Sequence, residues 1–139
     1  MTTPARIEPE HRFVEHGGEV EVELTAETES GIFAAGLDAF AELVAASEDG
    51  EPAEFPIALR GGDRTLLLVD WLNELLFLTE SEQFVPARIA SIELGDETLQ
   101  ATVAGYCGTP RPLVKGVALN GLRFEQEGGA WHGHVVFDV

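Results

Sequence analysis

The alternation of glutamate and aliphatic residues from Glu19 to Leu24 is the feature that most limits how this chain can fold. It places Val20, Val22 and Leu24 on one side of an extended segment and the glutamates on the other. A helix cannot separate residues in this way, because its side chains repeat every 3.6 residues. The segment therefore predicts a strand with one buried face and one face in water.

Two further segments have the spacing of amphipathic helices. The first should be capped by Thr28 or Ser30 and should end before residue 47. Its apolar residues recur at spacings of four, three and four: Phe33, Leu37, Phe40 and Val44. The second should be capped by Asp63 and run to about Thr79. Its apolar side carries Leu68, Trp71, Leu72, Leu75 and Leu78.

The remaining segments predict strands separated by turns. They cover residues 55–59, 90–94, 99–105, 114–125 and 130–139. A chain of 139 residues suits one domain. The predicted fold class is α+β: a single-domain sandwich with two helices packed on one face of a mainly antiparallel sheet.

The formal net charge of −17 limits the partners of the chain. Affinity for nucleic acid comes largely from Lys and Arg at phosphates, and here these number only eight. We therefore expect no direct binding of nucleic acid and no attachment to an anionic membrane. An acidic surface suits a basic protein partner, but it would equally serve solubility alone.

Other features point to the cytoplasm. Cys107 is the single cysteine, so no disulfide can form within the chain. The first ten residues lack the apolar core of a signal peptide. No run approaches the ~20 apolar residues of a membrane span.

The last predicted strand places two histidines on one face, His132 and His134, with Asp138 further along. Such a pair can bind zinc, which would favour a metal-dependent enzyme. The alternative is two solvated histidines on an open sheet face. The sequence contains no Ser-His-Asp triad, Walker motif or HExxH motif, and we expect no enzyme.

The carboxylates of Asp138 and of the terminal Val139 should lie close together and repel each other. A hard cation such as Ca²⁺ or Mg²⁺ would relieve this repulsion, since these ions prefer clustered oxygen ligands.

Three segments together resemble the archease family. They are FVEHGGE at residues 13–19, DWLNELLFL at 70–78, and LVKGVALN at 113–120 followed by WHGHVVFDV at 131–139. The first is similar to the family's aromatic-x-Glu-His-Thr-Ala-Asp, and the second to its Leu-x-Glu-Leu-Leu helix signature. The third resembles a Val-Lys-Ala-Val-Thr-Tyr-His strand and a closing aliphatic-Asp-aliphatic. The resemblance implies an archease-like domain over residues 13–139, after a flexible N-terminus at 1–12.

The resemblance implies a non-catalytic activator of an RtcB-type tRNA or RNA ligase. Such a protein promotes guanylylation and turnover of the ligase in tRNA splicing or RNA repair. By position, the family's metal site falls on Glu19, Asp138 and Val139, with Ca²⁺ or Mg²⁺ as the cation. His16 would not bind the metal itself but would orient Glu19 through a hydrogen bond.

The chain departs from the family pattern at two places. Glu19 replaces the aspartate of the first motif, and Ala118, Leu119 and Asn120 replace Thr-Tyr-His. Two other functions stay open at this stage. One is a chaperone-like or general protein-binding module with a different client. The other is the metal-dependent enzyme that would use the histidines of the last strand and Asp138.

Overall fold

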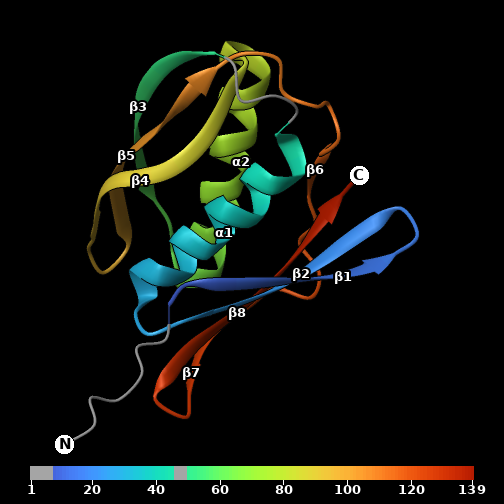
Figure 1. Cartoon of the computed structure of the whole chain (residues 1–139). Helices are drawn as coiled ribbons and strands as arrows, with labels where there is room; N and C mark the ends of the chain where they lie inside the picture. Colours follow the sequence, from blue (N-terminus) through green and yellow to red (C-terminus); the bar gives the residue numbers. More distant parts are fainter. Residues whose placement is uncertain (1–7, 46–49) are drawn as a thin grey trace, which may run out of the picture.

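Two antiparallel sheets enclose two helices in the computed structural model of the chain, which describes residues 8–45 and 50–139 (Figure 1). Along these residues the elements are β1 (Glu10–His16), β2 (Glu19–Ala26), α1 (Glu29–Val44), β3 (Glu51–Arg60), α2 (Arg64–Glu82), β4 (Phe84–Leu94), β5 (Thr98–Cys107), β6 (Gly116–Val117), β7 (Arg123–Glu127) and β8 (Ala130–Asp138).

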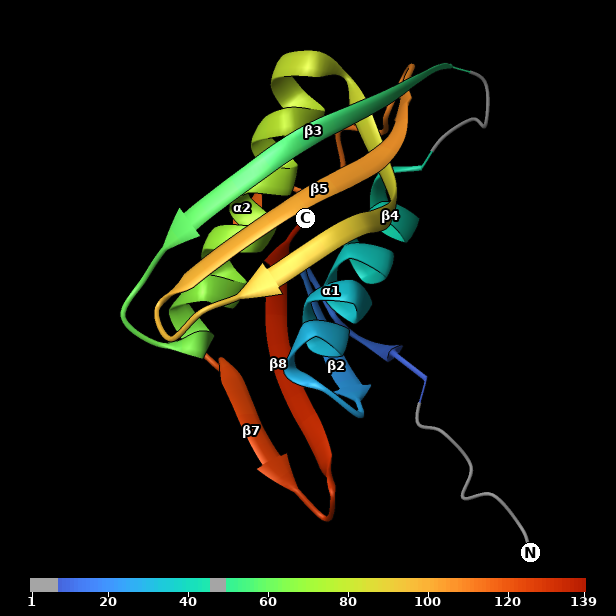
Figure 2. The same cartoon turned by 90° about the vertical axis from the view of Figure 1, so that its left-hand side faces the viewer.

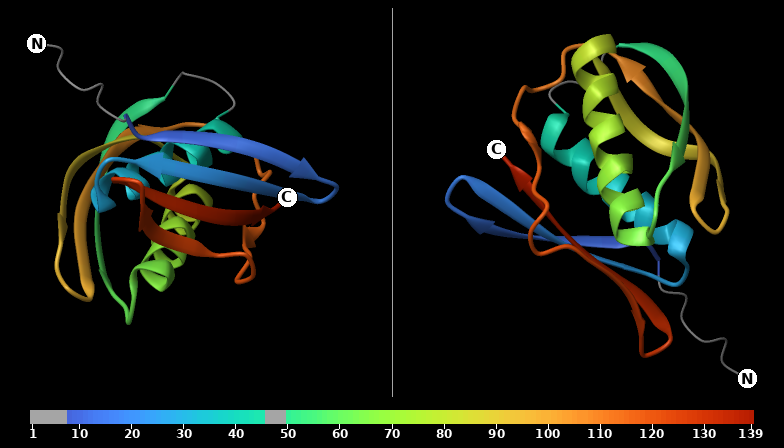
Figure 3. Two further views of the ribbon diagram at one scale, coloured as in Figure 1. Left: turned by 90° about the horizontal axis from the view of Figure 1, so that it is seen from below. Right: turned by 180° about the vertical axis from the view of Figure 1, so that it is seen from behind.

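The strands divide between a five-stranded and a three-stranded sheet, and every pairing is antiparallel. In the five-stranded sheet β2 lies between β1 and β8, while β6 and β7 pair with the other edge of β8. Seen from below in Figure 3, β1, β2, β8 and β7 lie side by side. In the three-stranded sheet β5 lies between β3 and β4.

The helices form the layer between the two sheets, and α1 packs against both β2 and β4 (Figure 2). The predicted α+β class with antiparallel strands and two packed helices is confirmed. One refinement is that the strands form two sheets, where the sequence suggested one. The reason lies in α1, whose buried residues span an arc of roughly 200° at 100° per residue, too wide for one sheet to cover.

Both predicted helix caps are present. The Thr28 hydroxyl accepts a hydrogen bond from Gly31 N–H at 3.0 Å, and the Asp63 carboxylate accepts one from Leu66 N–H at 2.9 Å. The fully buried Trp71 of α2 donates its indole N–H to the Phe33 carbonyl at 3.0 Å, which joins the two helices. Neither helix in the described part of the chain is long and apolar enough to cross a membrane.

The predicted strand at 114–125 is wrong as a single strand. The segment does run alongside β8, but it forms two strands, β6 and β7, with a loop at residues 118–122 between them. Gly121 in this loop has φ of +74°, a left-handed conformation that interrupts an extended strand.

The strand β1 was not predicted. Of the described side chains on its inward face only Phe13 is apolar, and His11 precedes it there, so the alternation that marks β2 is missing. Backbone pairing with β2 forms this strand. Within the segment expected to be flexible, residues 1–7 lie outside the described part, and Glu10 to Arg12 already belong to β1.

Candidate functional site

Glu19, the first residue of β2, lies directly opposite Asp138, the last residue of β8. Val139 follows at once, and its N–H donates to the Gly18 carbonyl at 3.3 Å. The three residues predicted for the metal site therefore lie together at one end of the five-stranded sheet. We call this region the Glu19–Asp138 end.

The backbone hydrogen bonds determine how closely the two carboxylates approach. Because Val139 bonds to Gly18, the next pair along the strands, Glu19 and Asp138, is one whose backbones do not bond each other. Accordingly, the Asp138 carbonyl turns to the other side and accepts from Lys115 N–H at 2.7 Å. Residues in such pairs have Cα atoms about 4.5 Å apart and the closest side chains. Both side chains are exposed, so two carboxylates repel each other in water.

Three glycines leave open space around these carboxylates. Gly17 and Gly18 form the turn before Glu19, and Gly116 lies opposite Asp138 in β6. A Cβ at any of the three would meet nothing within 4 Å. Gly18 has φ of +82°, which a side chain would oppose. The end is thus accessible from outside to an ion with its water shell or to a group of a partner protein.

The described side chains at the Glu19–Asp138 end offer a metal only oxygen ligands, which suit Ca²⁺ or Mg²⁺ better than zinc. Two side chains do not complete a site, however. Among the described side chains, which leave out those of Glu15 and His16, no three His, Cys, Asp or Glu cluster closely enough to hold a metal. Main-chain oxygens, water or a partner would supply the other ligands. His16 pairs with Glu19 through the backbone, but its side chain lies outside the described residues.

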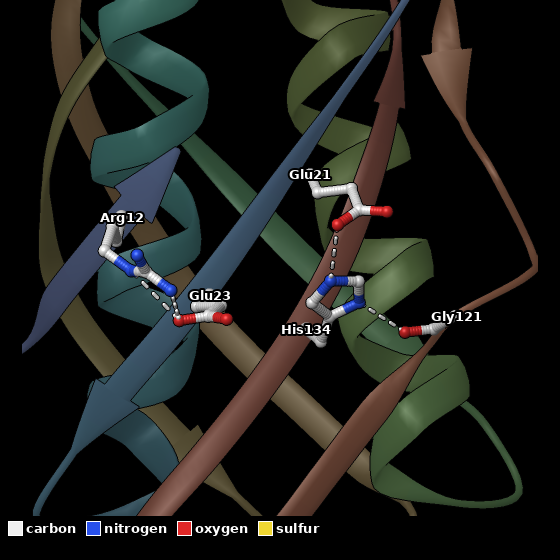
Figure 4. Close-up of polar contacts among 5 residues, drawn as sticks. All are labelled: Arg12, Glu21, Glu23, Gly121 and His134. Carbon is white, nitrogen blue, oxygen red and sulfur yellow. Dashed lines mark hydrogen bonds and ion pairs between the residues drawn. The ribbon is translucent and has the colours of Figure 1, made fainter. Parts of the chain in front are cut away.

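Next to this end, the middle of the same outer face carries paired charges (Figure 4). Arg12 on β1 donates two hydrogen bonds to the Glu23 carboxylate on β2, at 3.1 and 2.6 Å. Arg123 on β7 forms ion pairs with Glu125 and Glu127. Each of these carboxylates therefore has a cationic partner within the sheet.

The hydrogen bond from Arg12 is the main reason that the pKa of Glu23 lies below its ordinary value of 4.5. Desolvation acts in the opposite direction, and the charges of Arg12, His134 and Arg123 add to the lowering. Glu23 therefore stays ionised more readily in the folded chain than in the unfolded chain.

His134 links β8 to the loop at residues 118–122. Its Nδ1 lies 2.5 Å from the Gly121 carbonyl oxygen, and its Nε2 lies 3.6 Å from a carboxylate oxygen of Glu21 (Figure 4). A carbonyl can only accept, so Nδ1 carries the proton. The loop begins beside the Glu19–Asp138 end, since Ala118 N–H donates to the Val136 carbonyl at 2.8 Å.

The structure does not bring together the three residues of the metal-enzyme alternative. His132 and His134 share the outer face of β8 and are half-buried. Asp138 lies four residues beyond His134, roughly 13 Å along an extended strand. One metal ion cannot bridge that distance, and this alternative loses its geometric basis.

Sequence reasoning did not identify the ion pair of Arg12 with Glu23 or the contact of His134 with Gly121. The ion pair of Arg12 depends on β1, and this strand was not predicted because its alternation of apolar and polar residues is weak. Gly121 was treated as a weak point in a strand, although a glycine inside a strand pattern also marks a turn or close backbone approach.

Comparisons with known proteins agree with this fold. The chain matches the model of the archease protein family (MTH1598/TM1083) over residues 11–139. It is 28% identical to the archease of Methanosarcina mazei over 139 residues, covering 93% of this chain and 95% of that protein. It is 34% identical to the archease of Methanosarcina acetivorans over 99 residues, covering 65% of this chain and 67% of that protein.

Two solved structures share the fold. Protein 1598 of Methanobacterium thermoautotrophicum superposes with a TM-score of 0.73 at 23% identity, covering 93% of this chain and 98% of that chain. The archease TM1083 of Thermotoga maritima, which is described as a possible chaperone, gives 0.67 at 18% identity, covering 91% and 94%. With the family model matching nearly the whole chain, the protein belongs to the archease family.

Proposed function

We propose that this protein is a non-catalytic activator of an RtcB-type RNA ligase in tRNA splicing or RNA repair. Membership of the archease family supports this function. The observation that carries it is the Glu19–Asp138 end, where Glu19, Asp138 and Val139 meet at the exposed end of two inner strands of the sheet. These are the residues that the family resemblance assigns to the metal site.

The Glu19–Asp138 end would hold Ca²⁺ or Mg²⁺ through the two carboxylates and a main-chain oxygen of Val139. A bound cation would remove the repulsion between Glu19 and Asp138. The site is bordered by glycines with open space around them, so the ligase could contact the ion and its ligands directly. The contact would be between proteins, because a net charge of −17 opposes binding of RNA by this chain alone.

The loop at residues 118–122 flanks this site and contains the positions where the chain departs from the family pattern. Leu119 is 73% exposed there, where the family motif has a tyrosine. An exposed apolar side chain at the rim offers the partner a hydrophobic contact in place of a polar one. We propose that this loop adapts the protein to the ligase of its own cell.

Single-turnover guanylylation of the cognate ligase, with and without this protein, tests the proposal. We expect wild-type protein to increase the rate and Asp138→Ala to lose most of the increase. Glu125→Ala, which removes an exposed carboxylate from β7 of the same sheet, should act like the wild type. If the wild type leaves the rate unchanged, the activator function is wrong.

A chaperone-like role is the second candidate, because the related Thermotoga archease is described as a possible chaperone. The same acidic surface would then bind other clients. Suppression of heat aggregation of an unrelated protein, at stoichiometric amounts and without any effect on ligase guanylylation, would favour this candidate over the activator.

A further inference from the structure

Phe77 on α2 is a large apolar side chain that the fold does not bury. It is 58% exposed, whereas its neighbours Trp71 and Leu75 in the same helix are fully buried. Leu66, three turns earlier, is 47% exposed. At 100° per residue these two lie on the same side of the helix. Together with Asp70, Asn73 and Glu80, all exposed, they form what we call the α2 stripe.

Neither sheet covers the α2 stripe. Seen from behind in Figure 3, α2 faces the viewer along its length with no strand in front of it. The buried residues of α2 lie on its other sides and account for its packing in the core. The exposure of Phe77 therefore follows from the fold, and burial in the core does not explain why an aromatic residue stands there.

The charges around Phe77 are of one sign. Asp70, Glu74, Glu80 and Glu82 lie on α2, and within residues 8–45 and 50–139 no Lys or Arg forms an ion pair with them. Glu80 and Glu82 also stand in the last turn, which contains no basic residue. The C-terminus of a helix carries a partial negative charge, so carboxylates there are unfavourable. A cationic surface would relieve this.

These charges limit what can cover the stripe. A second copy of this chain would place glutamates against glutamates, and a nucleic acid or anionic membrane would be repelled in the same way. A basic protein surface that contains an apolar pocket complements both the acidic residues and the ring of Phe77. Aromatic anchors in such pockets contribute much of the affinity of protein interfaces.

We propose that the α2 stripe is a docking surface for the RtcB-type ligase, with Phe77 in an apolar pocket of a basic patch on the ligase. This inference rests on the proposed function, because the ligase is taken as the partner. It adds a second contact that is separate from the Glu19–Asp138 end, formed by a different element of the fold.

The test is the dissociation constant of the full-length protein and its cognate ligase, measured by calorimetry at low and high salt. We expect Phe77→Ser to weaken binding at least ~10-fold at both salt concentrations. Glu80→Lys should weaken it several-fold at low salt and less at high salt. Glu93→Lys is the matched control: it makes the same charge change on the outer face of the three-stranded sheet and should stay within about twofold of the wild type.

Several outcomes would overturn the inference. The inference is wrong if Phe77→Ser keeps its melting temperature and binds the ligase like the wild type. It is also wrong if Glu80→Lys and Glu93→Lys weaken binding equally. A dimer of this chain that Phe77→Ser abolishes would show a second copy on the stripe. If Phe77→Ser binds normally while the ligase is still activated, only the docking surface is wrong. If the wild type does not bind the ligase at all, the proposed function is wrong as well.

Discussion

In the middle of the five-stranded sheet, the carboxylate of Glu23 receives two hydrogen bonds from Arg12, whereas at the end of that sheet the carboxylates of Glu19 and Asp138 face each other. All three are exposed residues on the same outer face. In the middle, the protein supplies the compensating charge from neighbouring strands. At the end, no Lys or Arg among the described residues forms an ion pair with Glu19 or Asp138, which leaves these carboxylates open to a cation or a partner. The difference shows how one sheet face can combine a self-sufficient region with a region suited to binding.

The largest expected effect concerns metal at the Glu19–Asp138 end. Ca²⁺ at about 100 times its dissociation constant should stabilise the wild type by about 2.7 kcal/mol, because it binds only the folded site. This corresponds to a rise in melting temperature of roughly 10 °C for a chain of this size. Asp138→Asn should lose the rise and Glu125→Gln, on β7, should keep it. Thermal melts with Ca²⁺ and then with chelator measure this, and equal rises in Asp138→Asn and the wild type would refute the site.

The next effect concerns the loop that joins the two regions. His134→Ala removes the hydrogen bond to the Gly121 carbonyl, which contributes about 1 kcal/mol to holding the loop. Amides at residues 118–122 should then exchange with solvent about fivefold faster in hydrogen–deuterium exchange. His132→Ala, on the same face of β8, serves as the control and should leave the loop unchanged. Similar exchange in both variants would show that this bond does not restrain the loop.

Neutralising a single carboxylate should change the stability of the fold in opposite directions in the two regions. Without metal, Glu19→Gln removes repulsion from Asp138 and should stabilise the fold by roughly a few tenths of a kcal/mol. Glu23→Gln removes the partner of Arg12 and should lower the melting temperature instead. Both effects should shrink in high salt, where exposed charges are screened. Melts in chelator at low and high ionic strength check this, and a shared sign would contradict the comparison.

The smallest effect is the titration of Glu23. Its pKa lies below 4.5 in the folded chain, so its contribution to stability is present above pH 4.5 and is lost as the pH falls through the folded pKa. Arg12→Gln should move the pKa upward toward 4.5 and remove this contribution. Carbon-13 NMR of the carboxylates measures the change, with Glu125 as an internal reference. A pKa of Glu23 that does not respond would mean that Arg12 is not the cause.

Much of the fold could be predicted from local patterns. The caps at Thr28 and Asp63 follow from side chains that bind backbone N–H groups a few residues away. The alternation in β2 and the hairpin of β4 and β5 likewise depend on neighbours in the sequence. The weak patterns failed: β1 has too few apolar residues on its inner face, and Gly121 breaks a segment that otherwise reads as extended.

The candidate site shows the limit of such patterns more clearly. Glu19 and Asp138 are visible in the sequence as acidic residues, and the resemblance to archeases predicted that they bind a metal. Their position opposite each other depends on β2 and β8 pairing in one register, between segments at opposite ends of the chain. No local signal specifies that pairing.

The sequence by itself determined the two helices and most of the strands, together with the apolar face of each, because these properties arise from the period of the side chains along one segment. The tertiary structure alone decided how the strands divide into two sheets around α1 and α2. It also decided that Glu23 has a cationic partner while Glu19 and Asp138 repel each other, and that Phe77 remains in solvent. These outcomes depend on which surfaces meet when the whole core closes, and burial of one common core, rather than any single segment, selects that arrangement.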